Sequence, residues 1–285
     1  QRYHGPRLGR PHAVRTLSRD ALRASFGLGR PGRAKVIPLA LAALTAIPAI
    51  VTLGVVALAS RFGAGGAAEQ LSPIRFATYY TFVGQLLFLF CAAQAPELLV
   101  RDQRHSVLTL YFSRSIRRAD YALAKLAALA SALLLVQLFP QVVLFVGRAL
   151  AATDPLAAAT RDAGLLPAVL AQASLAAAVL TTVALAVAGY TPRRSYATAA
   201  IIAAYVIPPI VAELVEHAAG GGIARFLALA SMPDLLEAAN AWFFGSAPPD
   251  DSIGQLPGAF VVAVGVGVVL VAAALLVRRY RRIDA

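Results

Sequence analysis

Long apolar stretches alternate with shorter polar and basic segments along this chain. Several stretches run for about 20 residues with almost no charge, the length that a helix needs to cross the hydrocarbon core of a membrane. They are also too long and too rich in Ala and Leu for strands. We therefore predict an all-α polytopic membrane protein with six transmembrane helices: Val36–Ala59, Phe76–Ala95, Ala122–Gly147, Leu165–Tyr190, Ala197–Val215 and Gly258–Val277.

The segment before the first span, residues 1–35, is a basic N-terminal arm. We expect Gln1–Pro11, which is rich in Gly, Pro and Arg, to be disordered. In Ala13–Phe26 the apolar residues and the arginines recur on different helical faces, which predicts an amphipathic helix along the membrane surface. The arm lacks an apolar core, so no cleavable signal peptide is expected in it.

The six-span region, 36–285, has two distinctive segments on the side of the membrane opposite to the two termini. Arg148–Gly164 is expected to be a loop. The segment 217–257 follows a fifth span that Pro208-Pro209 should break, and it contains an apolar stretch divided at Pro233. Neither half is long enough to span, so we expect two short helices that dip into the outer half of the bilayer. Half-spans that line a pore are the alternative.

The basic residues predict how the chain is oriented. It carries 26 Lys and Arg against 14 Asp and Glu, a formal net charge of +12. An even number of spans puts both termini on one side. If that side is the cytoplasm, only five of the basic residues fall outside: Arg61, Arg75, Arg148, Arg161 and Arg225. This bias follows the positive-inside rule, so membrane topology explains the charge better than a nucleic-acid partner does.

The sequence offers little chemistry of its own. Gly27–Ala34 has the glycine spacing of a phosphate-binding P-loop, but Arg33 and Ala34 replace the Lys and the hydroxyl residue. The four histidines are scattered, so we expect no metal site and no cofactor bound by this chain. Charges near the middle of the spans, which ion-coupled carriers need, are nearly absent. Lys125 lies near the start of the third span and is expected to snorkel to the cytoplasm. Another subunit would therefore have to supply the work of transport.

The polar segment after the second span, Arg101–Lys125, is more ordered than a topology loop needs to be. Its apolar residues fall on one helical stripe with arginines around it. The wider segment Ala95–Leu129, APELLVRDQRHSVLTLYFSRSIRRADYALAKLAAL, resembles the first cytoplasmic loop of bacterial ABC-2 type permeases. The residues that carry the resemblance are Arg101-Asp102, Leu110–Arg114, Arg118–Tyr121 and Lys125. Ser115 departs from the family pattern, in which many relatives have proline.

The resemblance implies a division of labour between subunits in a bacterial plasma (inner) membrane, with both termini in the cytoplasm. The permease would pair with a second copy or a related permease. It would dock a cytoplasmic ABC ATPase subunit that binds the ATP and Mg. The implied docking surface includes a coupling loop over 96–121 and these residues: Arg15, Arg19, Arg101, Asp102, Arg104, Tyr111, Arg114, Arg117, Arg118, Asp120, Arg193 and Arg194.

A substrate path is expected between the two copies, along the second and fifth spans. Its candidate lining residues are Phe76, Tyr79, Phe82, Gln85 and Tyr205. For any single one, ordinary helix packing or an interfacial aromatic belt is the simpler interpretation. The expected function is ATP-driven export of a hydrophobic or amphipathic substrate. The alternative is a membrane scaffold or cofactor-assembly permease that recruits a cytoplasmic partner without such export. An intramembrane enzyme is a third reading, and the lack of a catalytic constellation counts against it.

Overall fold

The computed structural model describes residues 9–62, 74–104, 116–219, 221–247, 251–254 and 256–282, and the regular elements within these ranges are all helices. In chain order they are α1 (Gly9–Ser25), α2 (Arg33–Arg61), α4 (Phe76–Arg104), α6 (Arg118–Ala151), α7 (Pro155–Ala163), α8 (Leu166–Tyr190), α9 (Arg194–Ala219), α10 (Gly221–Ala230), α11 (Met232–Phe244), α12 (Asp251–Gly254) and α13 (Gly258–Arg281). The prediction of an all-α chain is confirmed for this part of the molecule.

Among the described residues, six helices are long and apolar enough to cross a membrane: α2, α4, α6, α8, α9 and α13. They coincide with the six predicted spans, and several are longer than predicted. The longest, α6, has 34 residues. At about 1.5 Å per residue it is about 50 Å long, which exceeds the roughly 30 Å of a hydrocarbon core. The polar first turn of α6, with Arg118 and Asp120, can therefore lie beyond the core.

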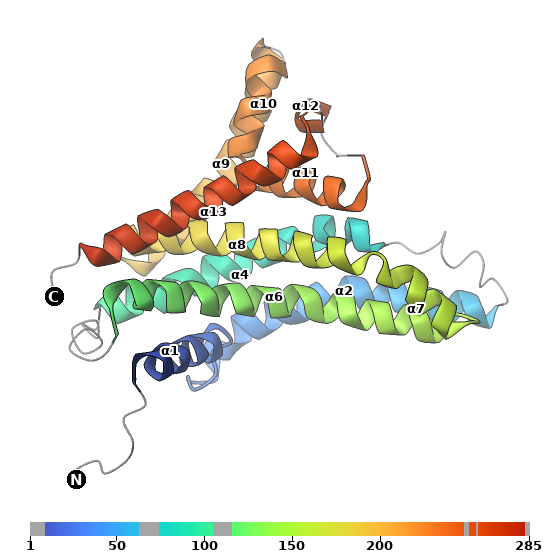
Figure 1. The fold of residues 1–285 in the computed structure, drawn as a ribbon, viewed down its shortest axis with the longest axis horizontal. Coiled ribbons are helices and arrows are strands. Elements are labelled where there is room, and N and C mark those ends of the chain that lie inside the picture. The colour runs from blue at the N-terminus through green and yellow to red at the C-terminus, as the bar shows by residue number, and fades with distance from the viewer. Residues whose placement is uncertain are drawn as a thin grey trace, which may run out of the picture.

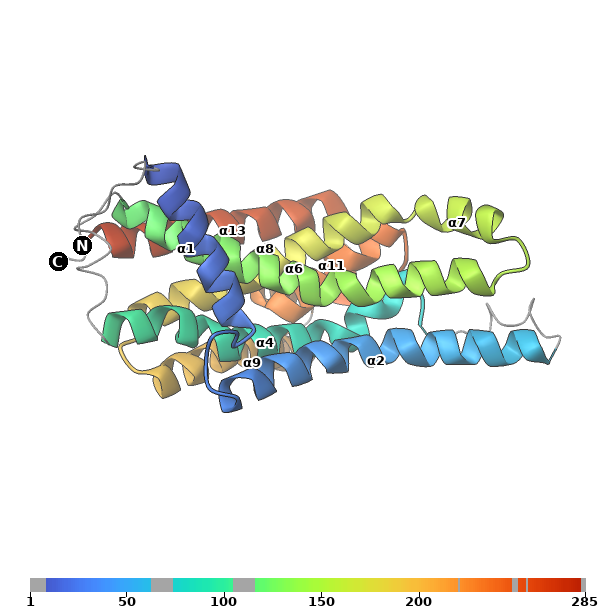
Figure 2. The ribbon, with the colours of Figure 1, turned by 90° about the horizontal axis from the view of Figure 1, so that it is seen from below.

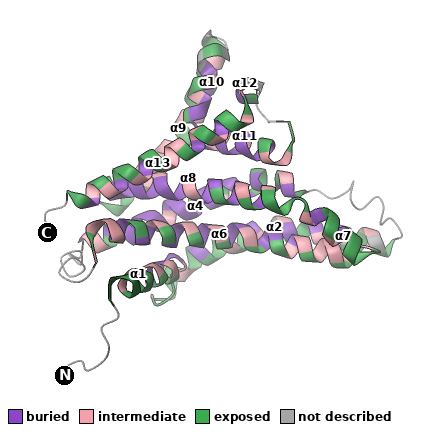
Figure 3. Cartoon of the chain, viewed as in Figure 1, coloured by how far each residue is buried: buried purple, intermediate pink, exposed green. Residues whose placement is uncertain are grey.

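The long helices pack side by side with α4 and α8 in the middle (Figure 1). α4 contacts α2, α6, α8 and α9, and α8 also contacts α6, α9 and α13. Buried residues concentrate on these two central helices, whereas α2 and α13 show much exposed surface (Figure 3). Small residues allow the close approach: Ala176 and Ala184 of α8 are buried, and a Cβ added to Gly189 would lie 3.1 Å from Leu276 Cδ1 of α13.

The apolar side chains that the bundle leaves exposed belong chiefly to its outer helices. Examples are Ile37 and Ile50 of α2, Ile207 and Leu214 of α9, and Leu270 of α13. In water these faces would be unfavourable, but hydrocarbon tails solvate them as well as a protein core does. The exposed faces therefore fit a multi-pass membrane protein.

The N-terminal helix α1 does not run along the bundle but lies obliquely across α6 and α4 (Figure 2). Leu17 and Ala21 of α1 are buried on the face that packs against the bundle, as the predicted amphipathic pattern requires. The helix begins at Gly9, earlier than predicted, and so includes the end of the segment that we expected to be disordered. Pro11 is tolerated there because the N–H groups in the first turn of a helix have no acceptor within the helix, so the missing N–H of proline breaks no hydrogen bond.

The structure corrects two predictions about irregular segments. Arg148–Gly164, expected to be a loop, contains the end of α6 and the short helix α7. Asp154 caps α7 by accepting hydrogen bonds from the N–H groups of Leu156 and Ala157, each at 3.1 Å, and Pro155 occupies its first position. The predicted break at Pro208-Pro209 is also wrong, because α9 continues through both prolines.

The two short helices expected after the fifth span are present as α10 and α11. They have 10 and 13 residues, so each is about 15–20 Å long and too short to span a membrane. Ser231 separates them and caps α11 by accepting a hydrogen bond from Asp234 N–H at 3.4 Å. The predicted division near Pro233 is therefore confirmed. α9 begins beside α4 and α8, and its end stands out from the bundle together with α10 (Figure 1).

Candidate partner-docking site

Polar and charged residues gather at one end of the bundle, where several distant segments of the chain meet. These segments are α1, the end of α4, the start of α6, the turn between α8 and α9, and the end of α13 (Figure 2). Ion pairs and hydrogen bonds join them. We call this region the arginine-rich end and describe it through its three carboxylates: Glu97, Asp102 and Asp120.

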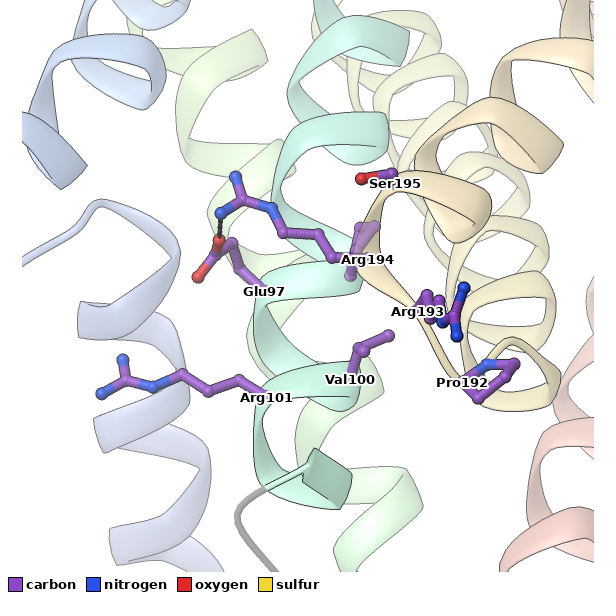
Figure 4. A pocket seen from close by; sticks show the side chains of 8 residues that line it. Glu97, Val100, Arg101, Pro192, Arg193, Arg194 and Ser195 are labelled. Carbon is purple, nitrogen blue, oxygen red and sulfur yellow. Dashed lines mark ion pairs between the residues drawn. The ribbon is translucent and has the colours of Figure 1, made fainter.

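Glu97 of α4 binds arginines from two other parts of the chain. Arg30 Nη1, in the turn between α1 and α2, lies 2.9 Å from Glu97 Oε2. Arg194, at the start of α9, pairs with Glu97 Oε1, and its side chain reaches across from α9 to α4 (Figure 4). Burial lowers the pKa of Arg30, and the charge of Glu97 opposes that shift. One carboxylate thus connects three segments.

The position of Arg30 depends on a tight turn after α1. Gly27 has a φ of +69°, and a Cβ added there would lie 2.5 Å from the carbonyl oxygen of Ala34. A side chain is therefore excluded on two grounds, the left-handed backbone and the lack of space. The N–H of Leu28 bonds back to the carbonyl oxygen of Arg23 at 2.9 Å, which closes the end of α1. The glycines that resemble a P-loop in the sequence thus make a helix-to-helix turn.

Asp102, in the last turns of α4, is the centre of a largely buried cluster. Lys125 Nζ of α6 lies 2.7 Å from Asp102 Oδ2, and the Tyr121 hydroxyl donates to the same oxygen at 2.8 Å. The neighbouring Gln103 donates to the Tyr280 hydroxyl of α13 at 2.9 Å. The ring centres of Tyr121 and Tyr280 are 5.1 Å apart. The cluster joins α4, α6 and α13.

Lys125 therefore does not snorkel to the surface, contrary to the sequence-based expectation. Its side chain is only 7% exposed, and its charge is compensated by Asp102 inside the bundle. The expectation was wrong because a basic residue near the end of a span has two ways to satisfy its charge, solvent or a partner. A partner on a different helix cannot be identified from the local sequence.

Asp120, in the first turn of α6, holds α1 in place. Arg10 donates to it twice, from Nε at 2.7 Å and from Nη2 at 2.6 Å, and the Arg117 N–H donates to it at 3.1 Å. The hydrogen bonds from Arg10 are the bidentate kind that planar guanidinium groups form with carboxylates. The hydrogen bond to Asp120 raises the pKa of Arg10. Asp120 thus binds within the chain and offers little to a partner.

The arginines predicted to dock a partner are mostly exposed where the structure describes them. Arg15 and Arg19 lie on the outer face of α1, and Arg101, Arg117 and Arg193 are exposed as well. Arg118 is half-buried and donates to the carbonyl oxygen of Arg281 at 3.3 Å. The side chain of Arg104 and residues 105–115, with Tyr111, Arg114 and Ser115, lie outside the described residues.

A cleft of about 550 Å³ opens at this end between α4 and the turn that begins α9. Its wall residues include Glu97, Arg101, Arg193 and Arg194 (Figure 4). Arg193 points away from Glu97 and lies 5.7 Å from the ring centre of Tyr196. A second cleft, of about 500 Å³, lies between α4 and the start of α2, and shares Glu97, Arg101 and Arg194 with the first. Both clefts are suited to anionic groups.

The five candidate residues of the substrate path divide into two groups. Phe76 and Tyr79 are buried, and the Tyr79 hydroxyl donates to the carbonyl oxygen of Thr45 at 2.9 Å. Tyr205 is also buried, with its ring stacked 3.7 Å from that of Phe88. Phe82 and Gln85 are instead exposed, three residues apart on one face of α4. The structure therefore does not bring the five together on one surface.

Sequence reasoning missed the roles of Glu97, Arg30 and Arg10. The available signal was Glu97 itself, an acidic residue directly after Pro96 near the end of a long apolar stretch. A carboxylate in such a position needs a cationic partner. The chain offers many arginines, so the partner could not be chosen without the fold.

Three or more His, Cys, Asp or Glu side chains do not come together as a possible metal site anywhere in the described ranges. No protein-family model matches the sequence, and no curated protein matches it significantly.

Proposed function

We propose that this chain is the membrane subunit of an ABC transporter, an exporter in a bacterial plasma membrane that uses ATP hydrolysed by a separate subunit. The observation that carries the proposal is the meeting of three segments at the arginine-rich end. These are α1, the end of α4 with the start of α6, and the turn between α8 and α9. They are the segments that the resemblance to ABC-2 type permeases implies as the docking surface, although they are far apart in the sequence.

Contacts within the chain give this surface a mechanical connection to the membrane helices. Glu97 links the α8–α9 turn to α4, and α1 packs against α6 with Leu17 and Ala21 buried. A partner that pushes on α1 or on the α8–α9 turn would therefore move long helices and not a loop alone. Short helices and tight turns transmit such displacements because packed elements move as rigid bodies. In this proposal α1 lies along the cytoplasmic interface, and α10 and α11 dip into the opposite leaflet.

The exported substrate is proposed to be hydrophobic or amphipathic. Phe82 and Gln85 are the path candidates that remain available to a substrate, because they are exposed on α4. The chain would act with a second copy, whose surface would complete the path. The ATP and Mg would be bound by the ATPase subunit, since the sequence of this chain contains no P-loop.

Co-purification with a P-loop ATPase tests the proposal, and we expect such an ATPase to be encoded by a gene that neighbours the gene of this chain. Charge reversal at two exposed docking arginines, Arg101→Glu with Arg193→Glu, should abolish co-purification and the ATP hydrolysis that depends on this chain in vesicles. The matched control is Arg61→Glu with Arg75→Glu, two exposed arginines outside the arginine-rich end, which should leave both measurements unchanged. Equal loss in both pairs would contradict the proposed docking surface. Binding of the ATPase without any change in hydrolysis would favour the scaffold alternative.

A further inference from the structure

The second cleft of the arginine-rich end has two chemically different parts. Its polar part contains four arginines, Arg30, Arg33, Arg101 and Arg194, against a single carboxylate, Glu97. Its other wall is formed by apolar residues such as Ile37, Pro38 and Ala93. We infer that this cleft binds an anionic phospholipid, with the phosphate on the arginines and an acyl chain against the apolar wall.

The charge balance leaves the cleft with unused positive charge. Glu97 is already shared between Arg30 and Arg194. Arg33 and Arg101 are exposed and pair with no carboxylate within the described part of the chain. Guanidinium groups bind phosphate oxygens in bidentate fashion, and basic pockets between membrane helices suit lipid headgroups. The four arginines and one carboxylate leave a formal charge of +3, so a phosphodiester, with a charge of −1, is attracted to the cleft and compensates part of that charge.

The depth of the cleft indicates that the ligand carries a hydrocarbon chain. The wall formed by α4 runs from Arg101 back to Ala93, about 12 Å along the helix axis and into its apolar part. On the facing helix, Ile37 is 54% exposed and continues into the apolar outer face of α2. A phosphate alone would leave this wall unused, whereas an acyl chain covers it.

An acidic peptide from a partner is less well suited to the same cleft. To reach Ile37 and Ala93 it would have to place backbone N–H and C=O groups against an apolar wall, where they would lack hydrogen-bond partners. A lipid presents a charged group and an apolar tail in the same order as the cleft presents its arginines and its apolar wall. The inference does not depend on the proposed ATPase partner, because it concerns the isolated chain and the bilayer.

Lipid retention tests the inference directly. The full chain is reconstituted in vesicles of equal parts phosphatidylglycerol and phosphatidylcholine, extracted in mild detergent, and analysed for bound lipid by native mass spectrometry. Phosphatidylglycerol should be retained in preference to phosphatidylcholine. Arg33→Gln with Arg101→Gln should reduce this preference by about fivefold for each arginine. Arg33→Lys with Arg101→Lys should keep only part of the preference, because lysine retains the charge but cannot bind phosphate in bidentate fashion. The matched control, Arg61→Gln with Arg75→Gln, should have no effect.

A second variant tests the apolar wall without changing any charge. Ile37→Trp should fill the cleft and lower the retention of phosphatidylglycerol while the melting temperature stays near that of the wild type. Equal retention of both lipids by the wild type would overturn the inference, as would full retention in the Arg33/Arg101 variant. Displacement of the lipid by inorganic phosphate would assign the cleft to a free anion. Binding of a polyglutamate peptide that needs the same arginines and persists in excess phosphatidylglycerol would assign it to an acidic partner.

Discussion

Two carboxylates at the arginine-rich end, Asp102 and Asp120, are similarly shielded, at 18% and 12% exposed, but bind cations that differ in exposure. The partner of Asp102 is Lys125, whose side chain is 7% exposed, while the partner of Asp120 is Arg10, which is 44% exposed. The first pair joins membrane helices to one another. The second pair fastens α1 to the surface of the bundle. Both contacts are short, so geometry alone does not distinguish them.

The difference in burial determines what each pair can do. A buried pair is strongly coupled, because removing one partner leaves an uncompensated charge in a medium that solvates it poorly. An exposed pair gains little, because water and salt screen it. The Asp102 cluster therefore behaves as a fixed joint between α4, α6 and α13. The Asp120 pair behaves as a contact that can open and close with little change in free energy, as a docking element that moves would require.

The largest effect is expected from breaking the buried pair. Asp102→Asn should leave the charge of Lys125 without compensation and lower the free energy of unfolding by about 3 kcal/mol. The loss should appear as a reduced melting temperature of the purified chain in detergent.

The double variant Asp102→Asn with Lys125→Met separates charge from packing. It removes both charges and should recover most of the loss, since an apolar side chain of similar length replaces the buried lysine. A double variant no more stable than Asp102→Asn alone would mean that the cluster stabilises the bundle through hydrogen bonds and not through charge compensation.

The turn between α1 and α2 should show an intermediate effect. Gly27→Ala places a Cβ against the carbonyl oxygen of Ala34 and forces alanine into a left-handed conformation, which together should cost about 2 kcal/mol. The displaced turn should also release Arg30 from Glu97. Gly29→Ala is the matched control, because Gly29 has a φ of +82° but open space around it, and strain alone should cost about 1 kcal/mol. Thermal unfolding in detergent measures the stability of both variants. Equal losses of stability in Gly27→Ala and Gly29→Ala would show that crowding at Gly27 contributes nothing.

Much of the helical framework could be predicted, because apolar length and caps are local signals. The six spans followed from uninterrupted apolar runs, and the break before α11 followed from Pro233. Signals for α7 were also present, since Asp154-Pro155 is an N-cap followed by a proline at the first helical position, but the segment was interpreted as a loop. The break that we predicted at Pro208-Pro209 gave these two prolines too much weight. In an apolar environment, ending a helix exposes more backbone groups than two prolines leave unpaired, so α9 continues.

The charged site was predicted only in outline. Sequence patterns indicated which segments would be polar, but each ion pair joins residues that are distant in the chain. Asp102 and Lys125 both belong to the segment that resembles the ABC-2 permease loop, yet nothing in that pattern shows that they bind each other. Arg10 and Arg30 were two among many arginines of the N-terminal arm. Pairing depends on the helix packing, which local periodicity does not determine.

The smallest effect is expected from the exposed pair, and it should depend on salt. Arg10→Gln should lower the free energy of unfolding only slightly, and the difference should shrink as ionic strength rises. The local effect should be clearer, with faster amide hydrogen exchange in α1 and little change in α4 or α6. Arg19→Gln, on the same helix and exposed, is the matched control and should leave the exchange of α1 unchanged. If Arg10→Gln destabilised the whole bundle as strongly as Asp102→Asn, the two ion pairs would contribute equally to the stability of the bundle. The exposed pair could not then serve as a contact that opens while the inner cluster stays closed.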